Sequence, residues 1–190
     1  MLEIKNLTVS FGENEALKEV SFMVKENETI GVVGESGSGK SLCSLAIMNL
    51  LPSAAKVVGG SIFFQGVNSM TTYKGIRGRK IGMIFQEPMT SLNPVFTCGA
   101  QILETILSNE NVTEKEAKKR TYELLEMVKL PDPKKIFHQY PHELSGGQKQ
   151  RIMIAAAISC NPALLIADEP TTALDVTVQK EILSLLKDLQ

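Results

Sequence analysis

The sequence predicts an α/β protein with a mainly parallel sheet, an N-terminal antiparallel β element and an inserted helical subdomain. Three observations support this fold class. The chain opens with two β-like runs joined by a polar stretch, which is typical of antiparallel strands. Short β-branched apolar runs then alternate with helical patterns, which is typical of a core whose central strands are buried on both faces. From about residue 97 to residue 157, helical spacing dominates and strands are hard to find.

Composition and charge argue against several kinds of protein. The 190 residues include 20 Lys and Arg against 21 Asp and Glu, so the formal net charge is −1. That balance argues against a protein that binds nucleic acid by neutralising many phosphates. The longest apolar run, residues 152–158, is far shorter than the ~18 residues that a membrane-spanning helix needs. The N-terminus has no secretory signal pattern, and three well-separated cysteines favour reduced thiols. We therefore expect a globular cytoplasmic protein.

The first half of the chain is expected to hold most of the strands. They are predicted at residues 2–11, 20–24, 30–33, 61–64 and 81–85. Residues 30–33, Ile-Gly-Val-Val, are apolar throughout, so we expect a central strand that is buried on both faces. A glycine- and serine-rich turn and a helix at residues 41–51 follow, and Pro52 is expected to stop that helix.

The middle and the end of the chain are read in the same way. Thr113 and Glu116 have the spacing of a capping box at the start of a helix. The charges on that helix, which include Lys118, Lys119 and Arg120, are interpreted as a solvated face. A last strand is predicted at residues 163–167 and a last helix at 176–189. The expected division is a first part of the core at 1–96, the helical subdomain at 97–157 and a second part of the core at 158–190.

One segment matches a phosphate-binding loop at every fixed position of G-x-x-x-x-G-K-[ST]. Glycines let backbone N–H groups point inward around phosphates, and the following helix presents its positive end to them. Lys40 would reach the β- and γ-phosphates of ATP, and the Ser41 hydroxyl would bind Mg²⁺. The simpler alternative is a glycine-rich turn that binds nothing. The candidate ATP-binding residues, in a core of the P-loop NTPase type, are Gly34, Glu35, Ser36, Gly37, Ser38, Gly39, Lys40 and Ser41.

Two acidic residues, Asp168 and Glu169, follow the predicted strand at residues 163–167. In an open α/β sheet, ligands bind outside the carboxyl ends of the strands. Asp168 would hold Mg²⁺, and Glu169 would orient and deprotonate the attacking water. An acidic turn after a strand is the plainer interpretation of the pair by itself, but the phosphate-binding loop favours the catalytic one.

The pentapeptide Leu-Ser-Gly-Gly-Gln at residues 144–148, together with the two motifs above, resembles the signature of the ABC-transporter ATPases. A plain capped helix start is the alternative, since Ser145 and Gln148 also have capping-box spacing. The resemblance covers essentially the whole chain. It implies that Gln86 senses Mg²⁺ and takes part in catalysis with Lys40 and Glu169, and that Phe11 stacks on adenine. It also implies that a second subunit's ATP contacts the signature residues Ser145, Gly146, Gly147 and Gln148, and that the loop containing Asp175 crosses the dimer interface.

Three longer segments resemble one group within this family, the oligopeptide/dipeptide/nickel importer ATPases. The segments are residues 85–94, 140–144 and 167–177. The resemblance implies an ATP hydrolase that needs ATP and Mg²⁺ and powers import of oligopeptides or dipeptides. It implies a second ATPase subunit in a heterodimer, transmembrane permease subunits and, indirectly, an extracytoplasmic solute-binding protein. The location implied is the inner face of the cell membrane.

Two alternatives stay open at this point. One is a nickel or metal-chelate importer of the same family, and the other is a non-transport ABC ATPase of DNA repair or translation. The interval between Gln86 and Ser145 has no sustained heptads of the kind expected for a DNA-repair relative, and the charge balance argues against a nucleic-acid partner.

The resemblance also implies a switch histidine downstream of Asp175, but residues 176–190 contain none. The two histidines of the chain, His138 and His142, come before the signature. We therefore expect a chain that is truncated at its C-terminus, lacks its last strands and hydrolyses ATP poorly as it stands.

Overall fold

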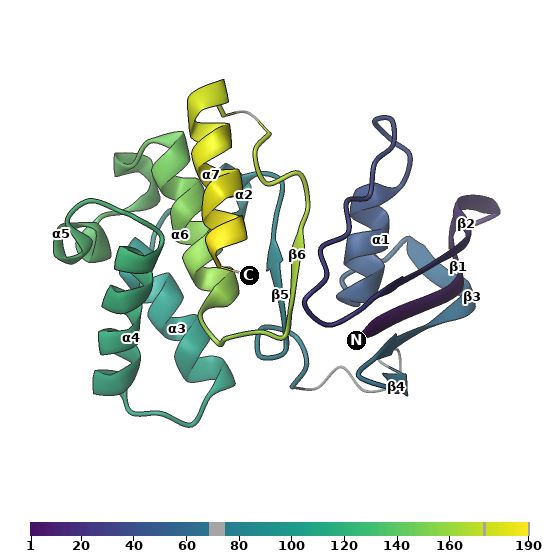
Figure 1. Ribbon diagram of the computed structural model, residues 1–190, viewed down its shortest axis with the longest axis horizontal. Helices are drawn as coiled ribbons and strands as arrows, with labels where there is room; N and C mark the ends of the chain where they lie inside the picture. The colour runs from purple at the N-terminus through teal and green to yellow at the C-terminus, as the bar shows by residue number, and fades with distance from the viewer. Residues whose placement is uncertain (69–74, 173, 190) are drawn as a thin grey trace. The chain divides into compact units, whose positions relative to one another are not determined.

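The computed structural model describes residues 1–68, 75–172 and 174–189, and the chain forms two compact units, Met1–Lys74 and Gly75–Gln190 (Figure 1). Each unit is described by itself. The mixed α/β class, the antiparallel N-terminal element and the helical region are all present. The three-part division into residues 1–96, 97–157 and 158–190 stays a prediction. Among the described residues, no helix is both long enough and apolar enough to cross a bilayer.

The first unit is built on an antiparallel sheet with strand order β2-β1-β3-β4. Its elements are β1 (Leu2–Phe11), β2 (Asn14–Val24), α1 (Lys40–Ile47), β3 (Ala55–Phe64) and β4 (Val67–Asn68). The predicted bounds of β1 are confirmed. β2 and β3 are longer than predicted, because each pairs with β1 from Leu2 to Phe11. A strand continues for as long as its neighbour supplies hydrogen-bonding partners.

A bulge in β1 decides which of its side chains enter the core. Leu2 and Ile4 are buried and so are Leu7 and Val9, so the alternation shifts by one residue between Ile4 and Leu7. The pairing register shifts at the same place, and Asn6 has a φ of 48°. Gly60 lies opposite with a φ of 82°, and a β-carbon there would come within 2.3 Å of the Asn6 carbonyl oxygen. The bulge therefore needs glycine on the facing strand.

The predicted central strand at residues 30–33 is wrong. This segment forms no strand, and Ile30, Val32 and Val33 are 38%, 55% and 93% exposed. An apolar run becomes a strand only where neighbouring strands pair with it, and the sheet of this unit is made of β1 to β4.

The end of α1 also differs from its prediction. The helix ends at Ile47 rather than near residue 51, because Asn49 adopts a left-handed conformation with a φ of 50°. The Leu50 N–H donates to the Leu45 carbonyl at 2.8 Å and the Asn49 N–H to the Ala46 carbonyl at 3.1 Å. This pair of bonds closes the helix before the chain reaches Pro52.

The second unit combines a parallel strand pair with a group of helices. Its elements are β5 (Ile81–Ile84), α2 (Pro88–Ser91), α3 (Cys98–Asn109), α4 (Glu114–Met127), α5 (Pro133–His138), the 3₁₀ turn η1 (Pro141–Glu143), α6 (Gly146–Ile158), β6 (Leu164–Ala167) and α7 (Val176–Asp188). β5 and β6 pair in parallel from Ile81–Leu164 to Ile84–Ala167. Figure 1 shows α3 to α7 gathered on one side of this pair.

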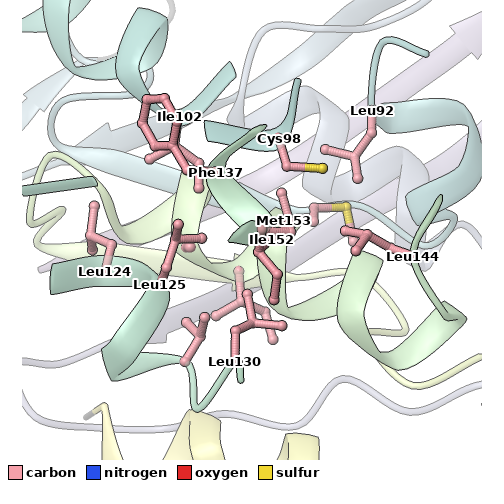
Figure 2. Packing of buried hydrophobic residues seen from close by; sticks show 14 of the residues in the cluster. Leu92, Cys98, Ile102, Leu124, Leu125, Leu130, Phe137, Leu144, Ile152 and Met153 are labelled. Atoms are coloured by element: carbon pink, nitrogen blue, oxygen red, sulfur yellow. The ribbon is translucent and has the colours of Figure 1, made fainter. Parts of the chain in front are cut away.

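One hydrophobic core joins the helices of the second unit. Figure 2 shows its side chains turned toward one another, among them Ile102 of α3, Leu125 of α4, Phe137 of α5 and Ile152 of α6. These four residues are at most 6% exposed. The core fixes α6, and with it the glycine-rich segment where α6 begins.

Arg120 corrects the expectation of a fully solvated face on α4. Its guanidinium contacts the Glu110 carboxylate and donates to the Ser159 carbonyl at 2.6 Å. The hydrogen bond from Arg120 is the main reason why the pKa of Glu110 lies below its ordinary value. Arg120 therefore ties α4 to the residues that follow α3 and α6. The sequence pattern could not show this, because both partners lie outside α4.

Candidate functional site

The predicted phosphate-binding loop lies in the first unit and leads directly into α1. Residues 34–38 are exposed, and the Ser38 N–H donates to the Glu35 carbonyl at 3.2 Å. Gly39 is the N-cap of α1 with a φ of 93°, and it has no side chain with which to cap the helix. A β-carbon at Gly39 would lie 2.4 Å from Leu17 Cδ2 of β2. The backbone conformation therefore favours glycine at this position, and a β-carbon would also force the Leu17 side chain to shift.

Lys40 turns back over its own loop. Its Nζ donates to the carbonyl oxygens of Gly34 at 2.9 Å and Glu35 at 3.0 Å. The ammonium group is thus held above the exposed turn of residues 34–38. A phosphate placed there would offer charged acceptor oxygens, which bind an ammonium group more strongly than neutral carbonyls do. Ser41 is the second residue of α1 and is partly buried.

Phe11 is the last residue of β1, with Asn14 and Ala55 as its strand partners. Its side chain is 39% exposed and precedes Gly12, which has a φ of 59°. An aromatic ring at the end of a strand, partly open to solvent, is suited to stacking on a planar ring.

In the second unit, the structure brings Gln86 and Glu169 together. Each follows the carboxyl end of a strand of the parallel pair, β5 or β6. Gln86 Nε2 donates to Glu169 Oε2 at 2.8 Å. The two residues are 83 positions apart in sequence, and the parallel register of Ile84 with Ala167 brings them together.

The backbone around the two acidic residues is held firmly. The Asp168 N–H donates to the Ile84 carbonyl at 2.9 Å, and Asp168 is 8% exposed. Glu169 has a φ of 46°, a left-handed conformation that is uncommon for glutamate. Such backbone strain is often found at functional sites, where the surrounding structure holds the residue in place.

The signature segment forms the start of α6. Ser145 is the N-cap, and the Gln148 N–H donates to Ser145 Oγ at 3.3 Å while the Ser145 N–H donates to Gln148 Oε1 at 3.0 Å. The capping box that the spacing allowed is therefore present. Gly146 is exposed, whereas a β-carbon at Gly147 would lie 2.9 Å from Val178 Cγ1. Gly147 thus has a packing role against α7, whatever else it contacts.

Asp175 caps the next helix. Its Oδ1 accepts the Val178 N–H at 3.0 Å at the start of α7. Ala173, which belongs to the predicted interface loop, lies outside the described residues. Asp175 therefore has a local structural role at the start of α7, and its role at a dimer interface stays a prediction.

Comparison with known proteins identifies the family. The family described as ABC transporter matches residues 17–172 of the chain. The chain belongs to the ABC transporter family. It is 51% identical over 199 residues to the "Oligopeptide transport ATP-binding protein OppD" of Bacillus subtilis, and the match covers 100% of this chain and 56% of that protein. It is 48% identical over 198 residues to the "Dipeptide transport ATP-binding protein DppD" of Haemophilus influenzae, covering 100% of this chain and 60% of that protein. The chain thus spans little more than half the length of these relatives.

A solved ABC structure shares the fold. The ATP-binding cassette MJ0796, in a dimeric post-hydrolysis state bound to ADP and Pi, is similar with a TM-score of 0.85 and 33% identity. The similarity covers 100% of this chain and 82% of that chain. The predicted ABC-type α/β fold is therefore confirmed.

Thr172 was not among the residues singled out from the sequence. Its Oγ1 donates to Glu169 Oε2 at 3.1 Å, so this carboxylate oxygen accepts hydrogen bonds from both Gln86 and Thr172. The available signal was a hydroxyl residue three positions after an acidic one, a spacing that a tight turn can close. The positive φ of Glu169, which shapes that turn, cannot be read from the sequence.

Proposed function

We propose that this chain is the ATP-binding and ATP-hydrolysing part of an ABC importer that takes up oligopeptides or dipeptides. The observation that carries the proposal is the meeting of Gln86 and Glu169 at the carboxyl ends of β5 and β6, in a chain that also has the phosphate-binding loop. The relatives' names, which specify oligopeptide and dipeptide transport, favour peptides over metal chelates.

The proposed roles in nucleotide binding follow from the chemistry of the side chains. Phe11 stacks on adenine, and residues 34–41 surround the phosphates, with the Lys40 ammonium on the β- and γ-phosphates. Hard oxygen ligands suit Mg²⁺. The Ser41 hydroxyl is the candidate ligand in the first unit, and the Gln86 amide oxygen and the buried Asp168 carboxylate are the candidates in the second unit. Bound Mg²⁺ would neutralise charge on the phosphates.

The proposed reaction is an in-line attack of water on the γ-phosphorus. The new bond joins the water oxygen to phosphorus, and the bond to the bridging oxygen of ADP breaks. Glu169 accepts the proton that the water loses. The γ-phosphate of the ATP bound to a second ATPase subunit contacts the signature residues Ser145, Gly146, Gly147 and Gln148. Asp175 lies at the interface between the two subunits. We propose a heterodimer for this pair.

The Glu169→Gln variant of the full-length protein, assembled with its permease, tests the proposal. An amide cannot accept the proton, so we expect ATP turnover to fall about 10²- to 10⁴-fold while Mg-ATP binding persists. Glu126→Gln, at an exposed position of α4, is the matched control and should leave turnover unchanged. Near-normal turnover by Glu169→Gln would exclude Glu169 as the base.

The permease is proposed to dock on the segment that follows α2. Val95 and Phe96 are 70% and 51% exposed there. The Cys98 N–H donates to the Gln139 carbonyl at 2.8 Å. This bond brings Tyr140, which is 40% exposed, close to the segment. Exposed apolar side chains that are close together favour a protein partner. Docking places the chain on the inner face of the membrane and connects it indirectly to a solute-binding protein.

Co-purification with the permease tests this docking surface. Phe96→Ser should reduce the amount of permease recovered, because it removes apolar area from the contact. Met127→Ser changes another exposed apolar residue of the same unit, 52% exposed, and should not reduce recovery. Equal recovery with both variants would place the permease elsewhere.

A further inference from the structure

The carboxylate of Glu169 is held by two donors of different kinds. Gln86 Nε2 reaches Oε2 from a residue 83 positions away, at the end of β5. Thr172 Oγ1 reaches the same oxygen from only three positions along the chain. The two donors therefore depend on different parts of the structure: the first on the pairing of β5 with β6, the second on the local turn.

That local turn is well anchored. The Thr172 N–H donates to the Glu169 carbonyl at 3.1 Å, which closes the turn on the backbone side. Further along the chain, Gln179 Nε2 of α7 donates to the carbonyl oxygens of Thr171 at 3.2 Å and Leu174 at 3.0 Å. The hydroxyl of Thr172 is thus presented from a backbone that is fixed on both sides. A β-branched residue also has restricted χ1 rotation, which holds the hydroxyl in one direction.

We propose that Thr172 is a positioning residue for Glu169, holding its carboxylate in the orientation that water activation requires. This inference rests on the proposed function, in which Glu169 is the base. In that function the Gln86 amide also serves Mg²⁺, so its bond to Glu169 competes with a second task. Thr172 belongs to the same turn as Glu169 and has the carboxylate as its hydrogen-bond acceptor.

The test compares Thr172→Val with Thr172→Ser in the full-length protein assembled with its permease. Valine keeps the shape and removes the hydroxyl, and a hydrogen bond to a charged group contributes enough that we expect kcat to fall about tenfold. The KM for ATP should change by less than about twofold, because positioning of the base acts on the chemical step. Serine restores the donor and should bring kcat back to within about threefold of the wild-type value.

Thr171→Val is the matched control. Thr171 is the same residue type one position away, and its backbone carbonyl accepts the bond from Gln179. Replacing its side chain leaves that carbonyl in place, so kcat should stay within about twofold of the wild-type value.

If Thr172→Val does not assemble with the permease, the ratio of kcat between Thr172→Ser and Thr172→Ala decides the question, since alanine removes the hydroxyl without adding a methyl group.

The Glu169→Gln variant distinguishes the two possible failures. Near-normal turnover by Glu169→Gln would refute the proposed function itself. Loss of turnover in Glu169→Gln, combined with a wild-type kcat in Thr172→Val, would refute only the role of Thr172. A serine variant no better than valine would also overturn the proposal. If the proposal is right, adding Thr172→Val to Glu169→Gln lowers the residual rate no further, because the two residues act through one carboxylate.

Discussion

The starts of α1 and α6 both contain glycines, but they are built in opposite ways. At α1 the N-cap is Gly39, in a left-handed conformation and with no side chain to accept the first N–H groups. At α6 the N-cap is Ser145, and a complete capping box with Gln148 closes the first turn. The first start relies on backbone shape and on the Lys40 side chain folded over the loop, whereas the second carries its own acceptors.

This difference matters for anion binding. A helix N-terminus attracts negative charge through N–H groups that have no acceptor within the helix. A glycine N-cap has no side chain that could accept these N–H groups, so they remain available to an anion. At the start of α6 the Ser145 side chain already accepts one of them. We therefore expect the start of α6 to bind a phosphate only together with groups of a second subunit. That agrees with the proposed sharing of one ATP between two subunits.

Among changes at the two helix starts, the largest effect is expected from removing the ammonium group at the start of α1. Lys40→Ala loses a charge-assisted contact to phosphate that is worth about 1.5–3 kcal/mol, so Mg-ATP affinity should fall at least about tenfold. Calorimetry on the purified protein measures it. Lys5→Ala, in the N-terminal half of β1 and paired with Glu3 at 3.1 Å, is the control and should leave affinity unchanged. Unchanged affinity in Lys40→Ala would show that α1 is not the phosphate site.

The second effect concerns the glycine N-cap. Gly39→Ala combines a backbone strain of about 1–2 kcal/mol with a close approach to Leu17, and the free energy of unfolding should fall by about 2 kcal/mol. Gly31→Ala has neither a positive φ nor any atom within 4 Å of the new β-carbon, so it is a matched control. Urea unfolding of the two variants measures the difference. Equal stabilities would mean that the start of α1 tolerates a side chain.

The third prediction distinguishes the capping role of Ser145 from its proposed role in ATP hydrolysis. Ser145→Ala and Thr113→Ala each remove the cap of a helix that has a capping box, so each should lower the free energy of unfolding by about 1 kcal/mol. Only Ser145→Ala should also lower ATP turnover in the assembled transporter, because α4 has no proposed contact with nucleotide. If turnover falls equally in both variants, the loss reflects stability alone, and the signature interpretation of Ser145 is weakened.

The smallest effect at neutral pH comes from Cys43, the fourth residue of α1. The positive end of a helix lowers a thiol pKa, but burial raises the pKa of Cys43 to about 11. In the unfolded chain the thiol ionises near pH 8.5. The contribution of the buried Cys43 thiol to folding stability is therefore fully present below about pH 8.5 and is lost as the pH rises toward 11.

Urea unfolding at pH 7.5 and at pH 10.5 measures this effect. Wild-type protein should lose more stability than Cys43→Ala between the two pH values, because the variant has no thiol at this position. Burial raises the pKa of Cys98 to about 11 as well, and the comparison cancels its contribution. Rapid reaction of Cys43 with thiol reagents at pH 7 would show that the helix terminus outweighs burial.

The features predicted well from the sequence are those that neighbouring residues decide. The capping box predicted at Thr113 is present, and so is the one at Ser145 that the spacing offered as an alternative, because each closes within three residues of chain. The phosphate-binding loop runs into a helix, as its motif requires. The antiparallel opening strand β1 has the predicted bounds, since alternation and turn residues define it locally.

Tertiary structure decided the rest, because it depends on partners that are distant in sequence. The apolar run at residues 30–33 forms no strand, since none of the strands β1 to β4 in its unit pairs with it. Arg120 was predicted to be solvated with the other charges of α4. Instead, its guanidinium contacts the Glu110 carboxylate and the Ser159 carbonyl. Gln86 and Glu169 were each singled out from the sequence, but their contact comes from the parallel register of β5 and β6. Hydrogen bonds that close within a few residues follow from local sequence, whereas those that join separate strands and helices depend on how the whole unit packs.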